Sequence, residues 1–150
     1  MIAIANDHSA LSVKAEILAM LDNMGLEYKD FGTYTTESCD YPVFSARAAN
    51  AVASGECDRG IVICGTGIGI SIVANKVKGI RCALCNDSLS AKLTREHNDA
   101  NMVALGARIT GPELAKEIVR VFLETPFSGD ERHVKRIGLI SAVENGEDLG

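Results

Sequence analysis

A thiol beside a glycine-rich loop is the first feature of this sequence that could do chemistry. Residues 61–71 read Ile-Val-Ile-Cys-Gly-Thr-Gly-Ile-Gly-Ile-Ser, so a run of β-branched residues ends at Cys64 and three alternate glycines follow. This pattern predicts a buried strand, a tight loop with accessible backbone N–H groups, and the start of a helix. Such a loop binds negative charge, because glycine lets the backbone approach a ligand and a helix N-terminus adds a positive dipole end. A thiolate at its mouth could act as a nucleophile or as a base.

Three common uses of such a loop do not fit the residues present. A phosphatase of the C-x5-R type needs an arginine where this chain has Ile70. A dinucleotide-binding loop needs G-x-G-x-x-G after the first strand, and a P-loop needs Gly-Lys followed by Ser or Thr. A buried structural cysteine and a plain tight turn remain alternatives, but the pattern favours an anion site with a reactive thiol.

Other titratable residues lie near the predicted ends of strands and helices. Asp7-His8 follows a predicted strand and His97-Asn98 ends a predicted helix, although a lone histidine is usually a surface or capping residue. Arg132 and Arg136 are four residues apart, so they share one helix face and could hold a phosphate, with a solvated basic face as the alternative. The pair Cys82 and Cys85 has C-x-x-C spacing but lies on a predicted strand with no second ligand pair, which favours core residues over zinc or redox chemistry.

The composition excludes several classes of protein. The 150 residues suit one domain, 47% of them are apolar, and the net charge of -5 argues against general nucleic-acid binding. No apolar run reaches the roughly 20 residues of a membrane span, and the N-terminus lacks the pattern of a signal peptide. The five cysteines are odd in number and show no disulfide framework. We therefore expect a cytoplasmic protein with no membrane partner.

Strands and helices are expected to alternate along the whole chain. The predicted strands are 1–5, 26–31, 59–64, 80–85 and 102–105. The predicted helices are 11–24, 42–54, a short one ending near 77, 86–97, 110–123 and 131–144, with a frayed tail at 145–150. This alternation predicts a single α/β domain over residues 1–150, a three-layer α/β/α Rossmann-like fold with a five-stranded parallel sheet in undetermined strand order.

The predicted elements also suggest where the titratable residues lie. Ligands of open α/β sheets bind at the carboxyl ends of the strands, so we expect Asp7, Cys64 and His97 to gather there. Within the helix at 11–24, the apolar spacing predicts an inward face that contains Leu11, Ala15, Leu18, Ala19 and Leu21. At 110–123, Thr110-Gly111-Pro112-Glu113 is similar to a capping box that opens the helix.

The motifs together resemble the ribose-5-phosphate isomerase B family, which also includes galactose-6-phosphate and allose-6-phosphate isomerases. The similarity covers nearly the whole chain, and its most specific stretches are Cys64-Gly65-Thr66-Gly67 and residues 96–101, Glu-His-Asn-Asp-Ala-Asn. Asp7-His8, Asp40-Tyr41-Pro42 and Arg132-His133 add to it. The resemblance implies an aldose–ketose isomerase that interconverts ribose 5-phosphate and ribulose 5-phosphate through an enediolate.

The resemblance also implies roles for individual residues. Cys64 would be the base, His97 the proton donor that opens the sugar ring, and Thr66 a hydrogen-bond partner of the ring or enediol oxygen. Backbone groups of Gly65, Gly67, Ile68 and Gly69 would form the anion hole. Asp7 and Asn98 would bind sugar hydroxyls. The phosphate would be held by His8, Arg132 and Arg136, with Arg108 lining the same site. Tyr41 would form a wall of the pocket.

In this family two subunits share each site, with the side that carries His97, Asn98 and the arginines coming from the partner. We therefore expect a homodimer, with a tetramer left open, and neither a metal nor an organic cofactor. Asn6, Ser9-Ala10 and residues 129–131 depart from the family pattern near the expected pockets, so the sugar stays open. The alternatives are allose 6-phosphate, another aldose, even an unphosphorylated one, and a binding module without catalysis. The presence of Cys64 favours ribose 5-phosphate over galactose 6-phosphate.

Overall fold

A five-stranded parallel sheet forms the centre of the computed structural model, which describes residues 1–150. The order of its strands is β2-β1-β3-β5-β4, and every neighbouring pair is parallel. The strands are β1 (Ile2–Asn6), β2 (Tyr28–Asp30), β3 (Arg59–Cys64), β4 (Cys82–Leu84) and β5 (Met102–Gly106). The predicted α/β fold is confirmed, and the strand order, which the sequence left open, puts β1, β3 and β5 side by side.

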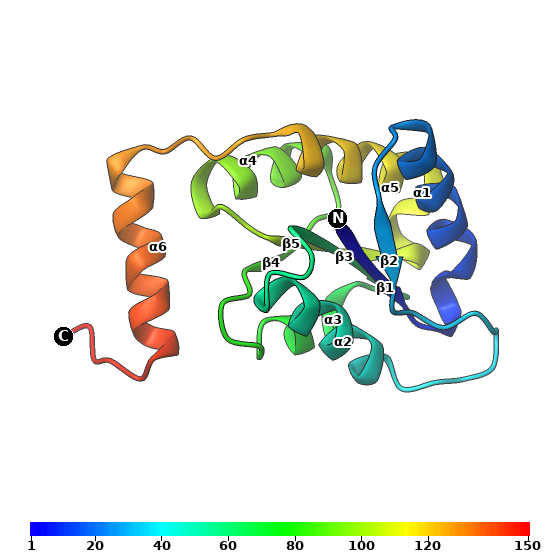
Figure 1. Ribbon diagram of the computed structural model, residues 1–150, viewed down its shortest axis with the longest axis horizontal. Coiled ribbons are helices and arrows are strands. Elements are labelled where there is room, and N and C mark those ends of the chain that lie inside the picture. Colours follow the sequence, from blue (N-terminus) through cyan, green and yellow to red (C-terminus); the bar gives the residue numbers. More distant parts are fainter.

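Helices cover both faces of this sheet (Figure 1). They are α1 (Leu11–Asn23), α2 (Tyr41–Ala53), α3 (Ile68–Ala74), α4 (Ser88–Asn98), α5 (Ala107–Glu124) and α6 (Glu131–Glu144), with a short 3-10 turn at His8–Ala10. Alternate side chains of a strand point to opposite faces, so Ile61 and Ile63 pack toward α1 and α5, whereas Val62 and Cys64 pack toward α2 and α3. This alternation places the Cys64 thiol on the face covered by α2 and α3.

The inward face of α1 differs from the predicted one. The buried residues are Val13, Lys14, Ile17, Met20 and Leu21. Of the five expected positions only Leu21 is correct, because Ala15 and Ala19 are exposed and Leu11 and Leu18 are only half-buried. The helix is apolar around most of its circumference, so spacing alone does not select a face, and the inward face also contains a lysine.

Helix α5 begins three residues before the predicted start and contains a break. Gly111 has a φ of 68° and a ψ of 172°, which is not helical, so Ala107–Thr110 is a separate turn and Pro112 opens the longer segment. The Thr110 hydroxyl donates to the Gly106 carbonyl at 3.2 Å, and the side chain caps no helix N–H group. The predicted capping box is therefore wrong, and the extra turn carries Arg108.

Helix α6 stands apart from the sheet, at the left of Figure 1, and residues 125–130 connect it to α5. Several of its apolar side chains are exposed, namely Val134, Leu139, Ile140 and Val143. None of the helices has both the length and the apolar character that crossing a bilayer requires. The exposed apolar side chains of α6 are unusual for a helix that packs only on its own chain.

Candidate active site at the carboxyl edge of the sheet

The Cys64 thiol ends β3 and is almost fully buried, with 5% of the residue exposed. Its sulfur accepts a hydrogen bond from the backbone N–H of Gly67 at 3.1 Å. Gly67 has a φ of 77°, and a Cβ there would lie 2.5 Å from Cδ1 of Leu84 and 2.8 Å from the carbonyl carbon of Leu105. Only glycine fits this turn, so the loop is shaped to bring its backbone onto the sulfur.

The loop that follows Cys64 is tied to itself and to α5. The Thr66 hydroxyl oxygen accepts the N–H of Ile68 at 3.2 Å, and the Gly65 carbonyl accepts the N–H of Arg108 at 3.0 Å. Two of the N–H groups expected to hold the substrate, those of Gly67 and Ile68, thus donate within the loop. A substrate oxygen would have to share or replace these bonds, whereas the exposed Thr66 side chain is directly accessible.

Asp7 follows β1 and lies beside the end of β3, since its N–H donates to the Ile63 carbonyl at 3.1 Å. Its carboxylate oxygen Oδ1 accepts two hydrogen bonds from Ser9, from the backbone N–H at 2.9 Å and from the hydroxyl at 2.6 Å. The residue is only 7% exposed, and Oδ2 makes no hydrogen bond to the protein. Ser9 therefore orients this carboxylate and leaves one oxygen for a ligand.

Three more predicted residues border the loop. A Cβ at Gly69 would lie 2.6 Å from the Tyr41 hydroxyl, and one at Gly65 would lie 3.4 Å from Nη1 of Arg108, so both side chains lie against the loop. His8 follows Asp7 directly, and its Nδ1 accepts the backbone N–H of Cys39 at 3.3 Å. Tyr41, His8 and Arg108 come after β2, β1 and β5, and β1 and β5 flank β3 in the sheet. The fold therefore gathers them at the carboxyl edge around Cys64.

His97 and Asn98 lie at the opposite end of the strands, so their expected place at the carboxyl edge is wrong. They end α4 and come before β5, in which Met102 pairs with Gly60 and Gly106 pairs with Cys64. The start of β5 is therefore four residues below the level of Cys64, which is about 13 Å at roughly 3.3 Å per residue. A segment that directly precedes a strand lies at the amino end of that strand, which is the physical reason for the difference.

A second cluster of basic residues forms at this amino end, where α4 ends and α6 begins. The rings of His97 and His133 are 4.5 Å apart between centroids. Nε of Arg132 donates to Nε2 of His133 at 3.4 Å, so Nε2 of His133 carries no proton. The proton of the neutral ring is therefore on Nδ1, which faces the Ser128 hydroxyl at 2.9 Å. Burial lowers the pKa of His133, and the nearby His97 and Arg132 lower it further. His133 is thus a neutral partner of this cluster.

Arg95 is a buried residue that sequence reasoning missed, and it holds this second cluster in place. The residue is only 2% exposed, and its guanidinium donates to the Thr125 carbonyl at 3.1 Å, the Ala100 carbonyl at 2.6 Å and the Asp99 carboxylate at 2.8 Å. These bonds connect the end of α4 to the end of α5. Arg95 therefore sets the position of His97 relative to the segment that leads into α6.

Replacing Arg95 with methionine is expected to lower the free energy of unfolding by about 2–4 kcal/mol, because it leaves two carbonyls and a half-exposed carboxylate without their donor. The measurement is urea unfolding followed by circular dichroism. Lys92→Met on the exposed side of the same helix is the control, and its ion pair with Glu96 should contribute less than about 1 kcal/mol. Equal unfolding midpoints for the two variants would contradict the role of Arg95.

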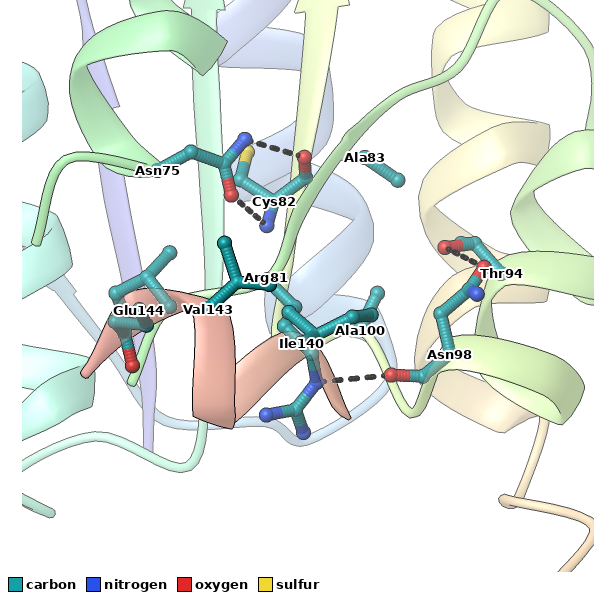
Figure 2. Close-up of a pocket in the computed structure, with 11 residues that line it drawn as sticks. Asn75, Arg81, Cys82, Ala83, Thr94, Asn98, Ala100, Ile140, Val143 and Glu144 are labelled. Atoms are coloured by element: carbon teal, nitrogen blue, oxygen red, sulfur yellow. Dashed lines mark hydrogen bonds between the residues drawn. The ribbon is translucent and has the colours of Figure 1, made fainter. Parts of the chain in front are cut away.

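A cavity of about 510 Å³ separates α6 from the edge of the sheet at β4 (Figure 2). Among the predicted site residues only Asn98 lines it, and its backbone carbonyl accepts Nε of Arg81 at 2.9 Å. The Asn75 side chain bonds both backbone groups of Cys82 at 2.8 Å and so replaces a neighbouring strand at this edge. Cys64 does not line the cavity, and no three His, Cys, Asp or Glu side chains of the chain converge as metal ligands would.

Comparison with known proteins assigns this arrangement to a family. The sequence profile described as Ribose/Galactose Isomerase matches residues 2–140. The chain belongs to the ribose/galactose isomerase family. Ribose-5-phosphate isomerase B of Escherichia coli K12 is 48% identical over 143 residues, which are 95% of each protein. The solved structure of ribose-5-phosphate isomerase B from Clostridium thermocellum is 53% identical, covers 97% of both chains and superposes with a TM-score of 0.94.

Membership in the ribose/galactose isomerase family establishes the class of reaction, but it does not establish which sugar is the substrate. D-erythrulose-4-phosphate isomerase of Pectobacterium atrosepticum is 46% identical over 129 residues, 85% of each protein, and its name specifies a shorter substrate. The relatives thus share a sugar phosphate isomerase reaction on different sugars. This chain is a sugar phosphate isomerase of the ribose-5-phosphate isomerase B type.

Proposed function

We propose that this isomerase interconverts D-ribose 5-phosphate and D-ribulose 5-phosphate through an enediolate, with Cys64 as the base. The observation that carries the proposal is the buried Cys64 sulfur, which accepts the Gly67 N–H in a loop that only glycine can form. In the aldose-to-ketose direction the thiolate takes the proton from C2 and returns it to C1, while the hydroxyl proton of O2 moves to O1. The developing negative oxygen is stabilised by loop N–H groups and the Thr66 hydroxyl, since fixed donors aimed at a new charge are a large part of catalysis.

Ring opening in this proposal uses His97 of the partner subunit. Within one chain His97 is at the amino end of the strands and Cys64 at the carboxyl end, so one chain alone cannot supply both. Exposed apolar side chains lie on the helices next to each cluster, with Ile68 and Ile72 on α3 at 53% and 54% exposure and Ile140 on α6 at 47%. Such patches are suited to subunit contact, which supports a homodimer in which each site combines one carboxyl edge with one amino-end cluster.

Phosphate binding would combine residues from the same two sides. His8 and Arg108 lie at the carboxyl edge, whereas Arg132 and Arg136 of the partner subunit approach from the first turns of α6. Guanidinium groups bind phosphate through paired, charge-assisted hydrogen bonds. Asp7 and the partner's Asn98 would contact sugar hydroxyls, and Tyr41 would close the side of the pocket next to Gly69.

The Arg132→Gln variant is expected to raise KM for ribose 5-phosphate by about 10- to 100-fold, the worth of one charge-assisted hydrogen bond, with a smaller change in kcat. Inorganic phosphate should weaken as a competitive inhibitor by a similar factor. Lys135→Gln is the matched control, because it removes an exposed charge from the same helix. Unchanged inhibition by phosphate in Arg132→Gln would argue against a phosphate clamp on α6.

A substrate panel separates this proposal from its alternatives. Ribose 5-phosphate, allose 6-phosphate, erythrulose 4-phosphate and free ribose are compared by kcat/KM in deuterated water. The proposal expects the highest value for ribose 5-phosphate and deuterium at the carbon that receives the proton. A preference for another sugar would correct the substrate, and binding without deuterium incorporation would indicate a module without catalysis.

We also propose that the enzyme works in the cytoplasm. All five cysteines are free, including the catalytic candidate Cys64 and the half-buried Cys39 and Cys82. Thiols persist in this state in a reducing compartment, whereas oxidising compartments favour disulfides. A catalytic thiol is best protected from oxidation in a reducing compartment.

A further inference from the structure

The β2–α2 loop, residues 31–40, crosses the carboxyl edge of the sheet and ends against His8. Its start is bonded to β1, because the Phe31 N–H donates to the Ile4 carbonyl at 2.8 Å and the Thr33 N–H donates to the Asn6 carbonyl at 3.3 Å. Residues 34–38 are all exposed. The next backbone contact beyond them is the Cys39 N–H, which donates to Nδ1 of His8. The position of the Cys39 N–H therefore depends on the contacts that hold the rest of the loop in place.

Lys14 is the side chain that fixes it. The residue lies on α1 and is only 4% exposed, although lysine is seldom buried without partners. Its ammonium donates to Oδ2 of Asp30 at 2.8 Å and to the Thr33 carbonyl at 2.9 Å, and it lies 4.4 Å from the centroid of the Tyr34 ring. Oδ1 of the same aspartate accepts the Gly32 N–H at 2.8 Å. One buried charge thus contacts the last residue of β2 and two residues of the loop, Thr33 and Tyr34.

The contact at the far end of the loop determines the protonation pattern of His8. A backbone N–H can only donate, so Nδ1 of His8 must be an acceptor without a proton. The neutral ring therefore carries its proton on Nε2. An Nε2–H group can donate to a phosphate oxygen, whereas the other tautomer would direct a lone pair at the same anion.

We propose that Lys14 is a positioning residue, which anchors the β2–α2 loop so that the Cys39 N–H holds His8 as the Nε2–H tautomer for binding the substrate phosphate. Lys14 does not contact the substrate, and its effect passes through Thr33, the loop and Cys39. The inference rests on the proposed function for the purpose of the tautomer, but the tautomer itself is a property of the free protein. It can therefore be tested without any substrate.

The first test is long-range proton–nitrogen NMR on protein labelled with nitrogen-15 histidine, recorded in alkaline buffer so that neutral imidazole rings are observed. A His8→Gln variant assigns the signals. We expect the shifts of an unprotonated Nδ1 and a protonated Nε2 for His8. The reverse pattern in the wild-type protein would overturn the proposal, and this measurement requires no variant of Lys14 to fold.

The second test compares variants. Lys14→Met keeps the length of the apolar stem, and Cys39→Pro removes the N–H while leaving Lys14 intact. Each should give a mixture of His8 tautomers and raise KM for ribose 5-phosphate by about tenfold, the scale of one lost charge-assisted contact, with kcat changed less than KM. Lys116→Met, which loses surface ion pairs with Glu16 and Glu113, and Cys39→Ala, which keeps the N–H, are the controls and should match the wild type.

The outcomes distinguish this inference from the proposed function. A folded Lys14→Met variant with the wild-type tautomer and KM would overturn the role of Lys14. A Cys39→Ala variant that loses the tautomer would assign the contact to the thiol, which lies 3.7 Å from Nδ1, and would also overturn it. A wild-type protein that has the Nε2–H tautomer but no activity on any sugar phosphate would instead count against the proposed function alone.

Discussion

Replacing Cys64 with alanine is expected to lower kcat/KM for ribose 5-phosphate by about 10²- to 10⁴-fold, the usual effect of removing a general base. Alanine has no group that can accept the C2 proton, and the Gly67 N–H loses the sulfur to which it donates at 3.1 Å. The fold should persist, because the change removes one buried sulfur atom and the loop is also held by the Arg108 N–H on the Gly65 carbonyl. Steady-state kinetics and deuterium incorporation into the sugar measure the loss.

Cys57→Ala is the matched control for this variant. Cys57 is also nearly fully buried, at 2% exposure, and packs in the same apolar cluster on the face covered by α2 and α3. Losing its sulfur should reduce stability to a similar degree without reducing kcat. If Cys64→Ala retains more than about a tenth of the wild-type rate, the base is another group, because general-base removal costs at least 10²-fold in most enzymes.

Mixing two inactive variants is expected to restore about a quarter of the wild-type activity if two subunits share each site. The variants are Cys64→Ala and His97→Gln, each of which should be nearly inactive alone. In a mixed dimer one site combines both defects, while the other combines an intact Cys64 with an intact His97 from the partner. Random exchange makes half of the dimers mixed, and each mixed dimer has one working site of two.

The control mixture pairs Cys64→Ala with Asp7→Asn. Both residues lie at the carboxyl edge of the same chain, since the Asp7 N–H donates to the Ile63 carbonyl next to Cys64. Each site of this mixed dimer would contain one defect, so activity should stay at the level of the separate variants. No recovery in the first mixture, with subunit exchange verified by labelled chains, would exclude a site shared between subunits.

Much of the fold and part of the site could be predicted from local patterns. The strand Arg59–Cys64 has the predicted bounds, and the glycine loop after it forms the expected turn against the thiol. Alternation of strands and helices predicted the parallel sheet correctly. These features depend on residues close together in the sequence, such as the positive φ of Gly67, which glycine adopts freely, so the chain itself contains the information.

The contacts that position the site involve segments far apart in the chain. Lys14 is buried only because the Asp30 carboxylate neutralises it and the Thr33 carbonyl accepts its hydrogen bond. Arg95 is buried only because Thr125, Asp99 and Ala100 accept its hydrogen bonds. A charged residue in a helix otherwise predicts a solvent-exposed position. No local pattern identifies such partners before the chain is folded.

By itself the sequence determined the elements, the thiol and its loop, because hydrophobic period and glycine geometry act over a few residues. Only the tertiary structure decided the order β2-β1-β3-β5-β4, which places Asp7, Cys64 and Arg108 after three adjacent strands. It also decided that His97 lies next to the amino end of β5, whereas Cys64 pairs with Gly106 at the carboxyl end of that strand. The physical reason is that strand pairing and direction, which act between distant segments, determine the end of the sheet at which each residue lies.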